Sequence, residues 1–196
     1  MLNKTDLLNI QIAIQALKKG GIIALPTDTV YGIAADAGME AAIEKINLLK
    51  KRPMDKNYIL QVGSINDAEK LCREWTPQIK KTVKKYWPGQ ITFIFNKNPE
   101  VSYPFLDETI AIRIPDHELC LTLLKLYDKP LVVTSLNMSG EPEILRVADI
   151  PEQIGEQLDY VLPEQGVFSQ KASTIVDLTR SYARVLRQGN VIFEAN

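Results

Sequence analysis

The spacing of apolar residues predicts an amphipathic helix at the start of the chain and a buried strand directly after it. The apolar residues that follow the i, i+3, i+4, i+7 spacing of one helical face are Ile10, Ala13, Ile14 and Leu17. Thr5 is the expected N-cap of this helix, and Gly20 and Gly21 are its expected stop. Residues 22–25 then form a short apolar run that Pro26 ends, which is typical of a buried strand.

Helices and strands alternate without a fixed order along the rest of the chain. Helices are predicted over 42–49, 117–126 and 147–158, and capping signals at Ser64 with Asp67 and at Thr76 with Pro77 begin two more, the second of which ends near Trp87. Strands are predicted over 58–62, 91–95, 110–114, 131–135, 173–177, 183–186 and 191–193. A loop is expected over 159–171. Because no regular βαβ repeat is present, the pattern favours an α/β fold with one twisted mixed sheet and flanking helices.

The composition is that of a folded soluble protein and limits what the chain is expected to bind. Hydrophobic residues make up 45% and charged residues 24% of the sequence, which excludes a collagen-like or disordered chain. A length of 196 residues predicts one domain over 1–196. Since 23 Lys and Arg stand against 24 Asp and Glu, the formal net charge is -1, and binding to nucleic acid would require a local basic cluster.

Neither a metal site nor a targeting segment is predicted. Cys72 and Cys120 stand singly in helix-like stretches, and with His117 as the one histidine they offer no zinc-binding spacing. We expect both cysteines to act as small apolar residues and His117 to lie at the surface in a first helical turn. Because the N-terminus lacks a signal-peptide pattern and no apolar run approaches the roughly 18 residues of a membrane span, the cytoplasm is the expected compartment.

Candidate chemistry lies in polar loops that follow apolar strands. The signatures GxxxxGK[ST], GxGxxG, HExxH and GxSxG are absent from the sequence. Loops after strands meet at the open edge of an α/β sheet, where ligands commonly bind. The first such loop, 26–32, carries Thr27, Asp28 and Thr29, and its hydroxyl groups can orient a small polar substrate. A tight turn in which these side chains bond their own backbone is the alternative.

Four further features have a functional and a structural interpretation each. The turn 50–56 carries four cations at a helix end, where they suit phosphate groups or simply complement the helix dipole in solvent. The loop 134–140 holds Thr, Ser and Asn side chains that either cradle a nucleotide or form a turn. Arg113 alternates with apolar neighbours, so it projects from one sheet face and binds an anion or forms a surface ion pair worth at most about 1 kcal/mol. Arg187 has the same two interpretations.

Six motifs, in this order, resemble the YrdC-like family. They are GGIIALPTDTVYG (20–32), KKRP (50–53), WPGQIT (87–92), IRIP (112–115), TSLNMSG (134–140) and STIVD (173–177). They extend over nearly the whole chain. One such motif would be weak evidence, but six in the family's order make a chance resemblance very improbable.

The resemblance implies both a fold and a reaction. The implied fold is an α/β fold with a twisted mixed sheet around a concave, positively charged cavity. The implied activity is that of an L-threonylcarbamoyladenylate synthase, which joins L-threonine, bicarbonate or CO2, and ATP, and releases pyrophosphate. The product feeds the threonylcarbamoyladenosine modification of certain tRNAs. Mg²⁺ is expected as the ion that accompanies ATP, with no metal site in the protein itself.

The resemblance also assigns site residues. Lys50 and Arg52 match the family's Lys-x-Arg element and are the expected catalytic residues, while Ser135 and Asn137 match its Ser-x-Asn element; both elements hold the nucleotide. The other nucleotide-side positions are Lys56, Thr109 and Arg187. The threonine-side positions are Thr29, Gln61, Arg113 and Ser173. The departures from the family pattern are Gln61 in place of a frequent histidine, Asn57-Tyr58 without the usual proline, and Ala172 in place of a common proline.

The length of the chain bears on which form of the family it resembles. The chain ends soon after Arg187, so the resemblance implies the short, single-domain form. By analogy, this form works together with tRNA threonylcarbamoyl-transferase proteins.

Two rival functions stay open. The first rival is a nucleotide-hydrolysing or carbamoyl-transfer paralogue; some paralogues lose one of the two paired motifs that this chain keeps. The second is a non-catalytic RNA-binding module, which the net charge and the lack of a basic and aromatic stripe disfavour. Weak RNA binding by the enzyme stays open.

Overall fold

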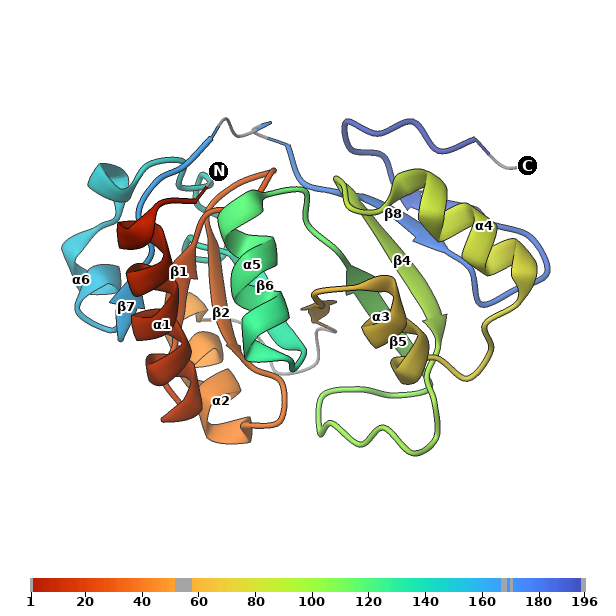
Figure 1. Cartoon of the computed structure of the whole chain (residues 1–196), viewed down its shortest axis with the longest axis horizontal. Helices are drawn as coiled ribbons and strands as arrows, with labels where there is room; N and C mark the ends of the chain where they lie inside the picture. Colours follow the sequence, from red (N-terminus) through yellow and green to blue (C-terminus); the bar gives the residue numbers. More distant parts are fainter. Residues whose placement is uncertain (1, 52–57, 167–168, 170, 195–196) are drawn as a thin grey trace.

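A mixed sheet of nine strands forms the centre of the computed structural model, which describes residues 2–51, 58–166, 169 and 171–194 (Figure 1). The order across the sheet is β7-β1-β2-β6-β3-β5-β4-β8-β9. The strands are β1 (Ile23–Leu25), β2 (Gly32–Asp36), β3 (Ile59–Gln61), β4 (Ile91–Asn96), β5 (Thr109–Arg113), β6 (Leu131–Ser135), β7 (Tyr160–Val161), β8 (Thr174–Asp177) and β9 (Arg184–Arg187). The pairs β1–β7, β3–β5 and β4–β8 are parallel and the others antiparallel. The predicted α/β fold with a mixed sheet is confirmed.

Helices cover both faces of this sheet. They are α1 (Lys4–Lys18), α2 (Glu40–Lys50), α3 (Ile65–Leu71), α4 (Pro77–Tyr86), α5 (Glu118–Tyr127) and the short α6 (Glu152–Gly155). Apolar residues of α1 and α5 share one core cluster with Ala34 and Val133, whereas those of α2, α3 and α4 share another with Ala35 and Val132. Because successive residues of a strand point to opposite faces, the two groups of helices lie on opposite faces.

Helices α1 and α5 pack on one face of the sheet at β1, β2 and β6, and this face, which also carries a cavity, is the cavity face. The strand register shows that Gln61 of β3 and Arg113 of β5 lie on the same face. In Figure 1, α1 and α5 lie in front of the left half of the sheet, and α3 and α4 lie in front of the right half. Both groups face the viewer because the twist of the sheet turns its faces over from one edge to the other.

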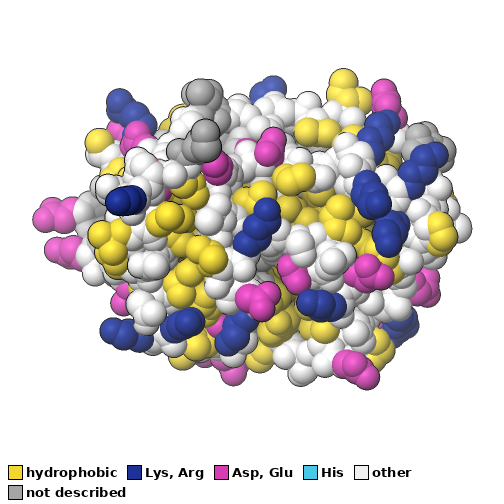
Figure 2. Space-filling model, in the orientation of Figure 1, with side chains coloured by type: hydrophobic (Ala, Val, Ile, Leu, Met, Phe, Trp, Pro, Cys, Tyr) yellow, Lys and Arg dark blue, Asp and Glu magenta, His cyan; other side chains and the backbone are white. Residues whose placement is uncertain are grey.

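A basic cluster lies on α4. Its lysines Lys80, Lys81, Lys84 and Lys85 are exposed, and Figure 2 shows Lys and Arg side chains gathered over this helix. Val83, on the inner side of α4, belongs to the core on the opposite side of the sheet from the cavity face. The chain therefore has a local basic cluster, but this cluster lies away from the cavity face.

The N-cap of α1 differs from the expected one. The cap is Asn3, whose side chain accepts from the Asp6 N–H at 3.0 Å, while the Asp6 carboxylate accepts from the Asn3 N–H at 2.8 Å. Thr5 lies inside the first turn and is exposed. A reciprocal capping box satisfies two backbone donors, which a single threonine two residues later does not.

Asn3→Ala is expected to lower the free energy of unfolding by about 1 kcal/mol, because it leaves a first-turn N–H without its acceptor. Thermal unfolding should show a melting temperature lower by roughly 2–4 °C. Thr5→Ala is the matched control and should leave the melting temperature within about 1 °C. An equal effect of the two substitutions would show that the capping box does not stabilise the helix.

Other elements depart from the predicted pattern. The predicted helix over 147–158 is split into a 3-10 turn (Val147–Asp149) and α6, because Ile150 precedes Pro151 and is driven out of the helical region. Residues 191–193 are not a strand; the Val191 carbonyl accepts from side chains, including Thr174 Oγ1 at 2.7 Å. Strands β2 and β7 were not predicted. None of the helices in the described part of the chain has the length and apolar character that crossing a membrane requires.

Candidate functional site

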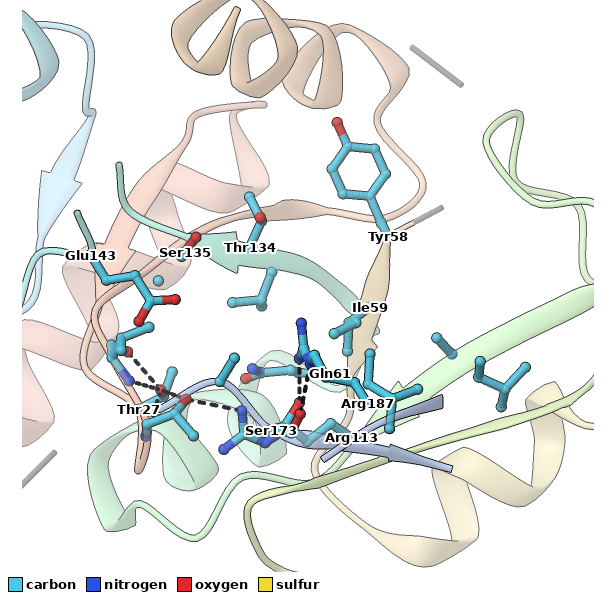
Figure 3. Close-up of a pocket in the computed structure, with 18 residues that line it drawn as sticks. Thr27, Tyr58, Ile59, Gln61, Arg113, Thr134, Ser135, Glu143, Ser173 and Arg187 are labelled. Atoms are coloured by element: carbon cyan, nitrogen blue, oxygen red, sulfur yellow. Dashed lines mark hydrogen bonds between the residues drawn. The ribbon is translucent and has the colours of Figure 1, made fainter. Parts of the chain in front are cut away.

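A cavity of about 380 Å³ opens on the cavity face, beside the part that α5 covers (Figure 3). Because alternate residues of a strand share a face, neighbouring segments line it with pairs of residues two apart. These pairs are Ile59 and Gln61, Ala111 and Arg113, Val133 and Ser135, and Ser173 and Ile175. The cavity thus has an apolar floor, with Gln61, Arg113 and Ser173 toward one end and Ser135 toward the other.

Arg113 is the most constrained charged group of the cavity. Its Nη2 donates to Asp28 Oδ1 at 2.5 Å, its Nη1 donates to Thr29 Oγ1 at 3.0 Å, and its Nε donates to the Gly89 carbonyl at 3.2 Å. Arg113 and Asp28 are both buried, so the alternative of a surface ion pair is wrong. Burial lowers the pKa of the Arg113 guanidinium, and the Asp28 carboxylate opposes that shift.

Both members of this buried pair keep polar atoms for which no hydrogen bond is found among the described residues. Asp28 Oδ2 is buried without a hydrogen bond. Arg113 uses three of its N–H groups in the bonds above, which leaves one N–H on each terminal nitrogen. Two such donors match a carboxylate, because the guanidinium fork and the two carboxylate oxygens have the same spacing.

The loop 26–32 combines both of its interpretations. Thr27 Oγ1 donates to the Val30 carbonyl at 2.7 Å and accepts from the Thr29 and Val30 N–H groups, so the expected self-bonded turn is present. Thr27 and Thr29 nevertheless line the cavity, and their hydroxyls lie 2.9 Å apart. The turn therefore holds the Thr29 hydroxyl in place between Thr27 and Arg113.

Ser173 joins β8 and β9 to the same wall. Its hydroxyl lies 2.8 Å from Thr92 Oγ1 and accepts from Arg187 Nη2 at 3.2 Å, while Arg187 Nε donates to the Ser173 carbonyl at 3.0 Å. Arg187 was expected on the nucleotide side and Ser173 on the threonine side. The structure places the two in direct contact, so Arg187 stands at the boundary between the two proposed halves of the site.

The Ser-x-Asn element lies on the other wall and is tied to Lys50. The Lys50 ammonium donates to the Ser135 carbonyl at 2.5 Å, to the Asn137 carbonyl at 2.7 Å and to Asn137 Oδ1 at 2.9 Å. The Ser135 hydroxyl also donates to Asn137 Oδ1, at 2.7 Å. Lys50 is 4% exposed. The alternative interpretation of Lys50, a solvated lysine at the end of α2, is therefore wrong, because this side chain turns inward to the loop after β6.

The expected site residues divide into four groups. Six of them line the cavity: Thr29, Gln61, Arg113, Ser135, Ser173 and Arg187. Lys50 and Asn137 support the cavity wall through Ser135, and Thr109 lies on the same face of β5 as Arg113, about 13 Å along the strand at roughly 3.3 Å per residue. Arg52 and Lys56 lie outside the described residues, as does Asn57.

Sequence reasoning missed two polar residues that line the cavity: Tyr58 and Glu143. Tyr58 lies in the predicted strand 58–62, and Thr134, which also lines the cavity, lies in the loop 134–140 that the sequence did single out. Glu143 follows Pro142 in a loop with no periodic pattern, so no sequence signal marks it. The lining side chains described here hold two guanidinium groups and one carboxylate, and the expected positive charge of the whole cavity stays a prediction.

His117, which lies outside the cavity lining, differs from its predicted role. His117 is the N-cap of α5 and is half-buried, with Nδ1 accepting from the Cys120 N–H at 3.4 Å and Nε2 lying 2.6 Å from the Gln165 carbonyl. It is thus a capping residue at the helix start and not an exposed first-turn residue. Among the described residues, no group of three His, Cys, Asp or Glu side chains is placed to hold a metal ion.

Both cysteine thiols are expected to be unreactive in the folded protein. Burial raises the pKa of Cys72 to about 12 and also raises the pKa of Cys120, whose thiol donates to Gln61 Oε1 at 3.6 Å. Since the thiolate is the reactive form, a disulfide reagent at pH 8 should label neither thiol within minutes and both after denaturation. Rapid labelling of the native protein would contradict the packing described for α3 and α5.

Comparisons with known proteins match nearly the whole chain. Residues 15–189 match the family model of Sua5, YciO and YrdC proteins, whose description is telomere recombination. A threonylcarbamoyl-AMP synthase of Vibrio campbellii is 33% identical over 189 residues, covering 92% of this chain and 99% of that protein. The threonylcarbamoyl-AMP synthase of Pyrococcus abyssi is 32% identical over 188 residues, covering 94% of this chain and 55% of that protein. This chain therefore spans about half the length of the Pyrococcus relative.

Solved structures share the fold. The crystal structure of Pyrococcus abyssi Sua5 complexed with L-threonine superposes with a TM-score of 0.85 at 31% identity, over 92% of this chain and 54% of that one. The crystal structure of Escherichia coli YciO superposes with a TM-score of 0.84 at 26% identity, over 96% of this chain and 92% of that one. The twisted mixed sheet with flanking helices is thus common to these proteins and to this chain.

Proposed function

The chain belongs to the Sua5/YciO/YrdC family, and from that premise we propose that it is an L-threonylcarbamoyladenylate synthase. It converts L-threonine, bicarbonate or CO2, and ATP into threonylcarbamoyl-AMP and pyrophosphate. The observation that carries this proposal is the buried Arg113–Asp28–Thr29 group beside Ser173 in one wall of the cavity. That wall offers a fixed fork and hydroxyls to a small amino acid, while Ser135 stands on another wall for a second substrate.

The amino-acid half of the site follows from the donors that Arg113 retains. Its two remaining N–H groups bind the threonine carboxylate, and Asp28 keeps the guanidinium from turning away. Thr29, Gln61 and Ser173 supply the polar groups that recognise the amino-acid side chain. Support for a threonine site comes from the related Sua5 structure, which was solved as a complex with L-threonine.

The nucleotide half is proposed around the loop after β6. Ser135 and Asn137 contact the nucleotide, and Lys50 acts as a positioning residue that fixes both through its three hydrogen bonds. Arg52, Lys56, Thr109 and Arg187 are proposed to contact the nucleotide or its phosphates. Mg²⁺ enters as part of the nucleotide substrate, because Glu143 is the one carboxylate among the described lining residues and a single carboxylate makes a poor cage for that ion.

The reaction needs positioning and neutralisation of charge, and no protein nucleophile. The threonine nitrogen, as the free amine, forms a bond to the carbon of CO2 and loses a proton to solvent, which gives a carbamate. With bicarbonate, that proton leaves together with the hydroxyl group of bicarbonate as water. A carbamate oxygen then bonds to the α-phosphorus of ATP as the bond to the oxygen bridging to the β-phosphate breaks, and pyrophosphate leaves. Holding the reactants side by side removes most of the entropic barrier, and the cations around the triphosphate offset the negative charge.

This proposal includes a cytoplasmic role in tRNA modification. Transferase proteins would use the product.

The first rival function remains that of a nucleotide-hydrolysing or carbamoyl-transfer paralogue. The second is an RNA-binding module, and the basic cluster on α4 is the described surface that would favour it. That cluster lies on the opposite side of the sheet from the cavity, so RNA binding there and catalysis in the cavity would be independent.

Release of pyrophosphate separates these functions. The purified protein is incubated with ATP, Mg²⁺ and bicarbonate, with and without L-threonine, and pyrophosphate is measured over time. The proposed function predicts release only when threonine is present. Equal release without threonine would instead identify a nucleotide hydrolase. No release under either condition, from a protein that binds RNA in a separate binding assay, would identify a binding module.

Selectivity among amino acids is expected to follow the hydroxyl group. L-serine should compete with L-threonine better than L-valine does, because valine leaves the buried polar groups of the site unpaired. We expect the inhibition constant of valine to exceed that of serine by about tenfold or more. Competition in the pyrophosphate assay measures both constants, and equal inhibition by serine and valine would remove Thr29, Gln61 and Ser173 from side-chain recognition.

A further inference from the structure

One carboxylate, that of Glu143, faces into the described part of the cavity. Figure 3 shows it projecting from the loop after β6 into the space across from Arg187. The side chains of the other charged residues in this lining, Arg113 and Arg187, are cations. Glu143 is therefore the only described lining group that can balance a positive charge on a bound molecule.

The loop that carries Glu143 is anchored at the next residue. Ile144 is 8% exposed and belongs to the main core cluster. Its carbonyl accepts from the Tyr31 N–H at 3.2 Å, which ties the loop to the start of β2. The position of Glu143 at the cavity is thus set by a packed and hydrogen-bonded neighbour.

Glu143 and Arg187 act on each other across the cavity. Desolvation lowers the pKa of Arg187, and the negative charge of Glu143 raises it. A carboxylate in this place repels the phosphates of a nucleotide and the carboxylate of an amino acid. It favours binding only if a cationic part of a substrate lies next to it.

A free amino acid carries a negative carboxylate and a positive ammonium group on the same α-carbon. Its carboxylate matches the N–H groups of Arg113, and Glu143, on another part of the lining, is the described carboxylate available to its ammonium group. We propose that Glu143 binds the α-ammonium group of the amino-acid substrate and thereby selects zwitterionic amino acids over other carboxylates. This inference rests on the proposed function and names the group that recognises one end of its substrate.

The chemistry assigns Glu143 to binding and not to the bond-forming step. The amine must lose its proton before it attacks CO2, whereas a nearby carboxylate favours the protonated form. Glu143→Gln is therefore expected to raise the KM for L-threonine by about tenfold or more and to leave kcat unchanged or higher. Loss of a merely structural contact would instead lower the amount of active enzyme and thus kcat.

A cycle of two proteins and two ligands tests the proposal. The full-length wild-type and Glu143→Gln proteins are titrated calorimetrically with L-threonine and with 2,3-dihydroxybutanoate, in which a hydroxyl replaces the ammonium group. The substitution should weaken threonine binding by about tenfold or more and change binding of the dihydroxy acid by less than about twofold. Glu141→Gln, which removes the same charge from the same loop outside the described lining, is the control and should bind both ligands as the wild type does.

The other outcomes overturn the proposal in distinguishable ways. Unchanged threonine binding by Glu143→Gln, or equal weakening of both ligands, removes Glu143 from ammonium recognition. If threonine binding is unchanged and more Mg²⁺ is needed for turnover with ATP, the cation that Glu143 faces is the metal ion of the nucleotide. If the wild-type protein binds no threonine while pyrophosphate release is independent of threonine, the proposed function fails together with this inference.

Discussion

Arg113→Ala is expected to weaken L-threonine binding by about tenfold or more while ATP binding changes by less than about threefold. The substitution removes the fork proposed to hold the threonine carboxylate. It also leaves the Asp28 carboxylate buried without its partner at 2.5 Å, so the free energy of unfolding should fall by about 3–5 kcal/mol. Calorimetric titration with L-threonine and ATP measures the first effect, and urea unfolding measures the second.

A double variant separates the loss of binding from the loss of stability. Asp28→Leu combined with Arg113→Met removes both charges at once, and an apolar pair of similar volume is often as stable as a buried ion pair. We expect this variant to regain most of the lost stability and none of the threonine binding. Wild-type threonine affinity in the double variant, or a defect of Arg113→Ala confined to ATP, would overturn the assignment of Arg113 to the amino acid.

Lys50→Ala is expected to lower the free energy of unfolding by about 3 kcal/mol, which corresponds to a fall in melting temperature of roughly 6–12 °C. The buried ammonium serves the Ser135 carbonyl, the Asn137 carbonyl and Asn137 Oδ1, and alanine leaves all three acceptors without this donor. Because the same bonds hold the loop after β6, synthesis of the adenylate should fall to near background. Thermal unfolding and the pyrophosphate assay measure the two effects.

Lys51→Ala is the matched control for Lys50. Lys51 is the next residue, is exposed, and adopts φ 50 at the end of α2. Alanine keeps a Cβ in this left-handed conformation, so stability should stay within about 0.5 kcal/mol. A Lys50→Ala protein as stable as Lys51→Ala would mean that the lysine does not organise the loop, and its place in the site would then rest on charge alone.

The fold was largely predictable because most of its elements carry a periodic pattern. The strand from Ile91 is a run of β-branched and aromatic residues, the helix after Thr76 has a clear capping signal, and both lie where expected. Strand β2 (Gly32–Asp36) was missed because all five of its residues are buried, so burial on both faces erased the alternation. The helix expected over 147–158 failed because apolar spacing ignores the restriction that Pro151 imposes on Ile150.

The candidate site was predictable where loops follow strands and was not predictable where contacts are distant in sequence. Six expected residues line one cavity because four of them lie on strands of the same sheet, while Thr29 and Ser173 lie in the segments just before β2 and β8. The bond from Arg113 to Asp28 joins residues 85 positions apart, and nothing in the local sequence of either residue signals it. The burial of Lys50 depends likewise on distant residues, those of β6 and the loop after it. The local sequence suggests the opposite, because a lysine in a charged run at a helix end is usually solvated.

Glu143 shows most directly which site residues the local sequence cannot predict. It stands in an irregular segment between the Ser-x-Asn element and the buried Ile144, and its sequence context is that of any exposed loop. Only the three-dimensional arrangement brings it opposite Arg187. Specificity contributed by such a residue is invisible to motif reasoning, because motifs record residues close together in the sequence.

Transfer of carbon from bicarbonate into an adenylate tests the central claim most directly. The purified wild-type protein is incubated with ¹⁴C-bicarbonate, ATP, Mg²⁺ and L-threonine, and the nucleotides are separated quickly and identified by mass. The account predicts a labelled species with the mass of threonylcarbamoyl-AMP, formed in equal amount with pyrophosphate and absent without threonine. Pyrophosphate or ADP without any labelled adenylate, from a protein that is folded and binds ATP, would contradict it.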